Sequence, residues 1–175
     1  MKRRMGDTLT GGTRDVNPQY LTVQVVESAA NTFTQATMAL PTLRGEIGRG
    51  KYQVIELLNT VIDLTPGDGA TGSGRAVQLT TSTQTGIIEL TDPDLVDEYR
   101  DDIIITTSGL YAPERPIIHD FTDKAGHGII IATQNMFVGI QGTSQTNGLT
   151  ARVRIYYRFK NISVDEFVGL AIQNN

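Results

Sequence analysis

The sequence predicts an all-β protein, and three observations lead to this prediction. Threonine supplies 23 of the 175 residues, and together with valine and isoleucine it favours strands over helices. Short runs of alternating apolar and polar residues recur along the chain, separated by turns that contain Gly, Pro, Asn or Ser. No long helical pattern interrupts these runs. Short strands at roughly even spacing indicate a β-sandwich or a jelly roll.

The length and composition bound the function. A chain of 175 residues is the size of one folded domain. The absence of cysteine excludes disulfides, thiolate metal sites and cysteine nucleophiles. A net charge of −4 argues, taken alone, against a general nucleic-acid binder. No apolar run approaches a membrane span and no secretory signal is present, so we expect a soluble protein without membrane insertion.

Residues 1–18 are predicted to form an N-terminal arm outside the folded domain, which then covers residues 19–175. The second half of this arm contains Gly, Asn and Pro at positions that favour turns. Lys2, Arg3 and Arg4 at its start are candidates for phosphate contacts, and nuclear import of the protein is an alternative role for the same residues.

Eight or nine strands are predicted in the folded domain. The first, over residues 20–27, alternates Leu21, Val23 and Val25 with polar residues, which is the pattern of a half-buried strand. The other unambiguous runs cover residues 33–40, 75–82, 103–107, 116–121, 128–133, 136–141 and 149–161.

Two segments carry helical signals. Residues 51–64 fit a helical stripe, but their Val, Ile and Thr content and the stop at Pro66 favour a long strand, which we prefer. Residues 92–99 predict a short helix in a loop, because Asp92 is a helix cap and Pro93 fits the first helical position.

No catalytic residue, metal ligand or cofactor site is predicted, and we therefore expect a protein that is not an enzyme. Residues 45–52 match a phosphate-binding loop except that Tyr52 replaces the required Ser or Thr. His119 and His127 stand near acids, but no nucleophile elbow or set of three spaced ligands accompanies them. Both are interpreted as structural histidines in turns.

Seven acidic residues gather between Glu89 and Asp102, with Arg100 as the single cation among them. Their spacing does not match a calcium-binding loop. A solvated acidic face is the preferred interpretation, and contact with an ion or with a basic surface of another subunit is the alternative.

The segment 152–160 carries the clearest functional signal. In a strand, its even-numbered and odd-numbered side chains point to opposite faces. The odd-numbered residues are apolar or aromatic, whereas the even-numbered face combines four cations with one aromatic ring: Arg152, Arg154, Tyr156, Arg158 and Lys160. Cations this close together repel one another unless a counter-charge such as phosphate is near, although a merely solubilising face is the alternative.

Three segments together resemble the small capsid proteins of circular single-stranded DNA viruses that encode a replication initiator. They are residues 9–19 (LTGGTRDVNPQ), 119–135 (HDFTDKAGHGIIIATQN) and 154–169 (RIYYRFKNISVDEFVG). The resemblance touches both ends and the middle of the chain. One departure is the lack of a long Arg-rich N-terminal arm.

This resemblance implies a single jelly roll of two four-stranded antiparallel sheets, many copies of which form an icosahedral shell around the genome. It also implies that the sheet with the last strand lines the shell interior. The cations of the segment 152–160 would then face DNA, and Tyr156 would be available to stack on bases.

The function we predict is therefore a viral capsid protein, located in the virion. Its partners would be other copies of itself and viral single-stranded DNA, bound by non-specific electrostatics; no host receptor follows from the sequence. The alternative is a β-sandwich binding module that recognises carbohydrate or a receptor, as part of a phage or cell-surface appendage.

Overall fold

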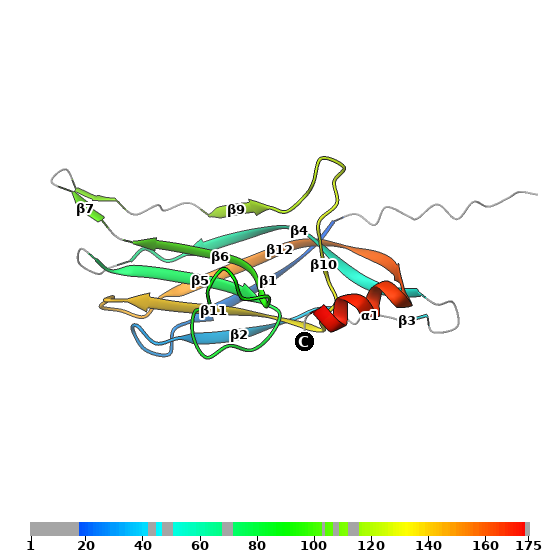
Figure 1. Ribbon diagram of the computed structural model, residues 1–175. Helices are drawn as coiled ribbons and strands as arrows, with labels where there is room; N and C mark the ends of the chain where they lie inside the picture. The colour runs from blue at the N-terminus through cyan, green and yellow to red at the C-terminus, as the bar shows by residue number, and fades with distance from the viewer. Residues whose placement is uncertain are drawn as a thin grey trace, which may run out of the picture.

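The computed structural model describes residues 18–41, 45–46, 51–67, 72–102, 104–106, 109–111 and 116–173. Within them the chain forms two antiparallel sheets that pack face to face (Figure 1). The predicted all-β class is thus confirmed. The described fold begins at residue 18, and the arm residues Lys2, Arg3 and Arg4 lie outside the described residues.

The first sheet has the last strand, β12 (Thr150–Ser163), at its centre. This strand pairs with β1 (Gln19–Val26) on one side and with β4 (Lys51–Leu64) on the other. On the far side of β4, β9 (Ile117–Asp120) and β10 (Ile129–Ile131) pair with successive parts of the same strand. They therefore act as one interrupted edge strand, and the short β3 (Gly45–Glu46) pairs with the start of β4.

The second sheet has the strand order β2, β11, β5, β6. Its strands are β2 (Thr34–Ala39), β11 (Asn135–Thr143), β5 (Gly74–Thr80) and β6 (Leu95–Asp102). Apart from these two sheets, β7 (Ile104–Thr106) pairs antiparallel with β8 (Gly109–Tyr111). Because the chain passes repeatedly from one sheet to the other, sequence neighbours are seldom neighbours in a sheet, which is the topology of a jelly roll.

The core fills the space between the two sheets with alternate side chains of both. Val153 and Ile155 of β12 are fully buried, as are Met136 and Ile140 of β11. Each such side chain contributes about 1.5–3 kcal/mol through removal of apolar surface from water. The period-2 alternation that predicted the strands therefore corresponds to their burial.

Neither of the two segments with helical signals forms a helix. The preference for a strand over residues 51–64 is confirmed, whereas the helix predicted over residues 92–99 is wrong. Residues 51–64 form the long strand β4. Residues 92–99 do not form a helix: the Asp92 carboxylate accepts a hydrogen bond from the Asp94 backbone N–H at 2.9 Å, which closes a turn, and β6 follows at Leu95. The capping signal of Asp92 was real, but pairing with β5 determines the structure that comes after it.

The helix of the described residues is α1 (Val164–Gln173), which follows the last strand and was not predicted. Its N-terminus is a capping box, in which Ser163 Oγ accepts from the Glu166 N–H at 3.2 Å and Glu166 accepts from the Ser163 N–H at 2.9 Å. The Tyr52 ring of β4 stacks on Phe167 with a centroid separation of 4.4 Å. No helix in the part of the chain that the structure describes is long and apolar enough to cross a membrane.

Glu27, just after β1, joins three parts of the fold. Its buried carboxylate accepts hydrogen bonds from the Gly142 N–H at 2.6 Å and from the Leu149 N–H at 2.7 Å. Replacing it by alanine leaves both donors unsatisfied. We expect Glu27→Ala to lower the free energy of unfolding by about 2 kcal/mol, which is a melting temperature lower by about 4–8 °C in thermal unfolding.

The control for this substitution is Glu89→Ala, because Glu89 is exposed and its carboxylate has no hydrogen bond among the described residues. It should shift stability by no more than about 0.5 kcal/mol. Equal melting temperatures of the two variants would contradict a structural role of the Glu27 carboxylate.

Candidate nucleic-acid interface

The five predicted residues of β12 lie on one face of the first sheet. The alternate residues Ala151, Val153, Ile155 and Tyr157 are buried in the core. The even-numbered residues between them, Arg152 to Tyr156, therefore point away from the second sheet, and Arg158 and Lys160 continue this face. We call this side the outer face of the first sheet; it also includes the outward residues of the neighbouring strands β1 and β4.

At one end of this face, the two arginines are only weakly compensated. Arg152 lies 3.4 Å from Asp63, and both side chains are about half exposed, so this ion pair contributes little to stability. Arg154 Nε donates to Thr22 Oγ1 at 3.0 Å, and its guanidinium lies 4.9 Å from the centroid of the Tyr20 ring. Among the described residues, no carboxylate pairs with Arg154.

At the other end, Arg158 and Lys160 converge on Glu56, which is only 1% exposed. Arg158 Nε donates to Oε2 of Glu56, and Lys160 Nζ lies 3.3 Å from Oε1. The backbone N–H of Gly128 also donates to Oε1 at 3.2 Å, and His127 Nδ1 is 3.6 Å from the same oxygen. We call this group the Glu56 cluster.

The pKa of Glu56 reflects these contacts. Burial acts to raise the pKa, but the hydrogen bonds from Arg158 and Gly128 and the charge of Lys160 together hold it below its ordinary value. The carboxylate is therefore ionised at neutral pH. Together, Glu56 and Asp63 offset half of the four positive charges of the predicted basic face.

Sequence reasoning missed Glu56 although a signal was present. It is the single charged residue between Val54 and Leu58 in an otherwise apolar part of β4. A lone acid in such a buried run requires a partner. Its partners come from β12 and from the loop before β10, and neither can be identified without the sheet order.

The prediction that the acidic residues between Glu89 and Asp102 form one solvated face is wrong, because they do not share one surface. Asp97 is buried between the sheets, where it accepts a hydrogen bond from Thr60 and lies 2.6 Å from His119 Nδ1. His119 is thus a strand residue that links the two sheets and does not lie in a turn. Asp101 instead accepts from Arg75 Nε at 2.9 Å.

No site for a metal ion or a phosphate loop emerges from the described residues. They contain no group of three or more His, Cys, Asp or Glu side chains placed to hold a metal. Gly45 and Glu46 form β3 and pair antiparallel with Tyr52 and Lys51, respectively, and the strand β4 begins at Lys51, where a phosphate-binding loop requires a helix. Residues 47–50 lie outside the described residues.

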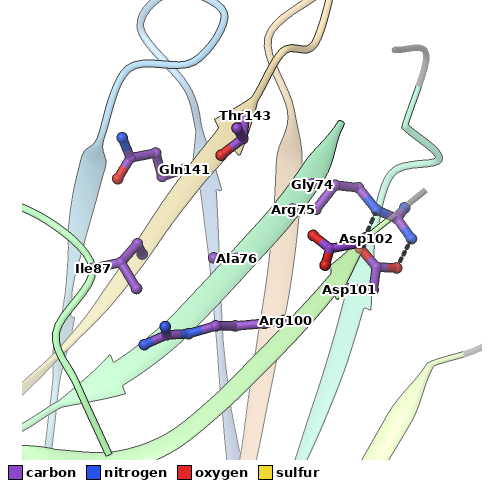
Figure 2. Close-up of a pocket in the computed structure, with 9 residues that line it drawn as sticks. All are labelled: Gly74, Arg75, Ala76, Ile87, Arg100, Asp101, Asp102, Gln141 and Thr143. Carbon is purple, nitrogen blue, oxygen red and sulfur yellow. Dashed lines mark hydrogen bonds and ion pairs between the residues drawn. The ribbon is translucent and has the colours of Figure 1, made fainter. Parts of the chain in front are cut away.

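A pocket of about 250 Å³ is lined by residues of β5, β6 and β11 and by Ile87 (Figure 2). Figure 2 shows the Arg75 guanidinium turned toward Asp101, whereas Arg100 extends in the opposite direction toward Ile87. Arg100 is itself paired with Glu98 at 2.8 Å. Because each guanidinium already has a carboxylate partner, the pocket does not favour an anionic ligand.

Comparisons with known proteins find similarity in structure but not in sequence. No family model and no curated protein sequence matches this chain. VP1 of the Trichodysplasia spinulosa-associated polyomavirus, in complex with 3'-sialyllactose, matches with a TM-score of 0.56 at 7% identity, over 86% of this chain and 97% of that one.

Two further VP1 structures match similarly. The VP1 pentamer of Human Polyomavirus 7 has a TM-score of 0.54 at 10% identity, over 82% of this chain and 96% of that one. Merkel cell polyomavirus VP1 in complex with disialyllactose has a TM-score of 0.53 at 7% identity, over 83% of this chain and 95% of that one. At such identities the likeness concerns the fold alone, and it establishes that this chain is a jelly roll of two antiparallel sheets.

Proposed function

We propose that this chain is a viral capsid protein that self-assembles into an icosahedral shell around a circular single-stranded DNA genome. The observation that carries the proposal is the jelly-roll fold, which matches VP1 capsid proteins over most of the chain. A VP1 pentamer among the matches is consistent with assembly from copies of one chain. The sequence resemblance to small capsid proteins supplies the genome type.

In this proposal the outer face of the first sheet lines the shell interior. Arg152 and Arg154 are its weakly compensated cations, and they would neutralise genome phosphates without base specificity. The net charge of −4 does not oppose this role, because a shell protein can direct a positive face inward and acidic surfaces elsewhere. Lys2, Arg3 and Arg4 of the arm would add to the interior charge.

Assembly is tested by expressing the full chain and examining it by negative-stain electron microscopy. Hollow particles of uniform size, or a discrete oligomer that closes into particles as salt or pH changes, are the expected result. A stable monomer over a wide range of salt and pH would argue against a capsid function.

Neutralising both weakly compensated arginines should weaken DNA binding and packaging. Each phosphate contact to single-stranded DNA contributes about 0.7 to the salt dependence of the logarithm of the association constant. We therefore expect Arg152→Gln with Arg154→Gln to reduce this slope by about 1.4, measured by fluorescence anisotropy with a thymidine oligonucleotide, and to reduce nuclease-protected DNA in purified particles.

The matched control removes two charges from other elements. Lys51 and Lys124 are both exposed, and neither belongs to β1 or β12. The variant Lys51→Gln with Lys124→Gln should keep the salt dependence of the wild-type chain. An equal reduction of the salt dependence in both double variants would show that only the net charge matters. It would contradict the assignment of Arg152 and Arg154 as DNA-binding residues.

A second candidate function is recognition of a carbohydrate. It is favoured by two of the matching VP1 structures, which are complexes with sialylated oligosaccharides. The pocket in Figure 2 offers Gln141 and Thr143 as hydrogen-bonding groups for sugar hydroxyls. Glycan-array binding by a discrete oligomer that never forms shells would favour this function over that of a capsid protein.

A further inference from the structure

We propose that Tyr20, Arg154 and Tyr156 form a stacking platform for unpaired nucleobases on the outer face of the first sheet. This inference rests on the proposed function and adds to it the chemical feature of the genome that is recognised. Tyr20 of β1 is 62% exposed. Its ring lies 6.1 Å from that of Tyr156, the residue directly opposite on β12.

Tyr20 has no role in the core. The residues of β1 that face the second sheet are Leu21, Val23 and Val25, whereas Tyr20 points outward with Thr22. Burying the ring of a tyrosine is strongly favourable. A ring left in water therefore represents apolar surface that is available to a partner with a flat apolar face.

Arg154 holds the platform together. Its guanidinium lies over the Tyr20 ring, 4.9 Å from the centroid, and Nε donates to Thr22 of the same neighbouring strand. This cation–π contact fixes the Tyr20 ring close to the sheet. The charge of Arg154 has no carboxylate partner among the described residues, so it is available to a phosphate next to a stacked base.

Apolar residues extend the platform across the sheet. The strand register places Val61 of β4 beside Arg154, and Ile118 of β9 beside Val61. Ile118 is 66% exposed. On the outer face, an apolar strip therefore lies beside the two tyrosines. Arg152 is the outward residue of β12 that precedes Arg154, where it can contact a further phosphate.

The occupant that fits these features is a single strand. Stacked, paired bases of a duplex cover their own faces, whereas unpaired bases expose them to aromatic side chains. Arg158 and Lys160 are paired with the Glu56 carboxylate. Weakly compensated positive charge therefore lies beside aromatic rings at the end of the face that carries Tyr20, Arg154 and Tyr156. A face built for phosphate alone has no need for two tyrosines that point outward, one of which is 62% exposed.

The test compares two probes that differ only in their bases. Binding of the full-length protein to a thymidine oligonucleotide and to an abasic oligonucleotide of the same length is measured by fluorescence anisotropy at fixed salt. We expect the thymidine probe to bind more tightly. Stacking of one base on an aromatic side chain corresponds to roughly a 5- to 150-fold gain in affinity.

The variant Tyr20→Leu with Tyr156→Leu keeps apolar bulk and removes both rings. It should bind the two probes equally, with its affinity for the abasic probe unchanged. The matched control, Tyr20→Phe with Tyr156→Phe, retains the rings and should retain the preference for the thymidine probe. Circular dichroism and thermal unfolding verify that each variant is folded before binding is compared.

The outcomes separate this inference from the capsid proposal. Equal binding of both probes by the wild-type chain overturns the platform, even if shells form. A platform that discriminates between the probes in a chain that forms no shells supports the inference and removes the capsid function. If the leucine variant changes only the oligomeric state, measured by light scattering, the face is a contact between copies and the platform is overturned.

Discussion

Replacing Gly128 with alanine is expected to lower the free energy of unfolding by about 3 kcal/mol or more. A Cβ atom at this position would lie 1.9 Å from the backbone oxygen of Leu57, in the middle of β4. Backbone cannot move aside as the end of a flexible side chain can. The segment before β10 must therefore shift, and the hydrogen bond from the Gly128 N–H to Glu56 is lost with it.

The measurement is thermal or urea unfolding of the full chain, with an expected decrease in melting temperature of about 6 °C or more. Gly86→Ala is the control, because an added Cβ there meets nothing within 4 Å. Gly86 also has no positive φ, so its substitution should leave stability nearly unchanged. A Gly128 variant as stable as the control would show that β10 does not approach β4 as closely as described.

The Glu56→Gln substitution is expected to lower the free energy of unfolding by about 2–3 kcal/mol. It removes the negative charge to which Arg158 and Lys160 both bind. The full penalty for an unpaired buried ion does not apply, since both cations remain partly exposed to water. In thermal unfolding the change corresponds to a decrease of about 5–10 °C.

Asp63→Asn is the control for Glu56→Gln, because Asp63 forms an exposed ion pair with Arg152 on the same sheet face. Exposed pairs contribute about 0–1 kcal/mol. We expect little change in this control. Similar losses in both variants would contradict a special role of the buried carboxylate.

The stabilisation by Glu56 should disappear at low pH. Its pKa is lower in the folded chain than in the unfolded chain, so protonation favours the unfolded state. The contribution is complete above the unfolded pKa of about 4.3 and is lost as the pH falls through the folded pKa. The difference in melting temperature between the wild-type chain and Glu56→Gln should therefore shrink below about pH 4.3.

The strands that face a core on one side were predictable from local pattern. Residues 20–27 and 149–161 alternate because every second side chain of β1, and of β12 as far as Tyr157, packs against the core. The same alternation is sufficient to assign Arg152 and Arg154 to the outward face of β12. A period of two residues is a property of one strand and needs no knowledge of its neighbours.

The errors arose where a local signal conflicts with pairing. In residues 95–102, Asp97 and Asp101 occupy positions that face the interior, where a typical strand has apolar residues. The sequence of this strand therefore lacks the alternation of apolar and polar residues. Thr60, His119 and Arg75 from other strands compensate these carboxylates. No property of the segment itself reveals that these partners exist.

The helix α1 was missed for a different reason. Ser163 and Glu166 form a capping box that is visible in the sequence. The strand signal of the preceding residues obscured it, since β12 continues up to Ser163 itself. Packing of Phe167 on Tyr52, far away in sequence, then attaches the helix to the first sheet.

For the candidate interface, the sequence identified the cations of β12 but could not decide which of them have a carboxylate partner. Glu56 lies about 100 residues from Arg158, and Tyr20 lies still further from Arg154. Sheet order alone brings β4 and β1 to the two sides of β12.

The sequence by itself determined the all-β class, the outward direction of Arg152, Arg154 and Tyr156 on β12 and the lack of cysteine chemistry. Only the tertiary structure decided that Glu56 neutralises one end of the basic face and that Tyr20 completes the aromatic pair at the other. The physical reason is that side-chain direction follows from local backbone geometry, whereas the compensation of a charge depends on which strands become neighbours.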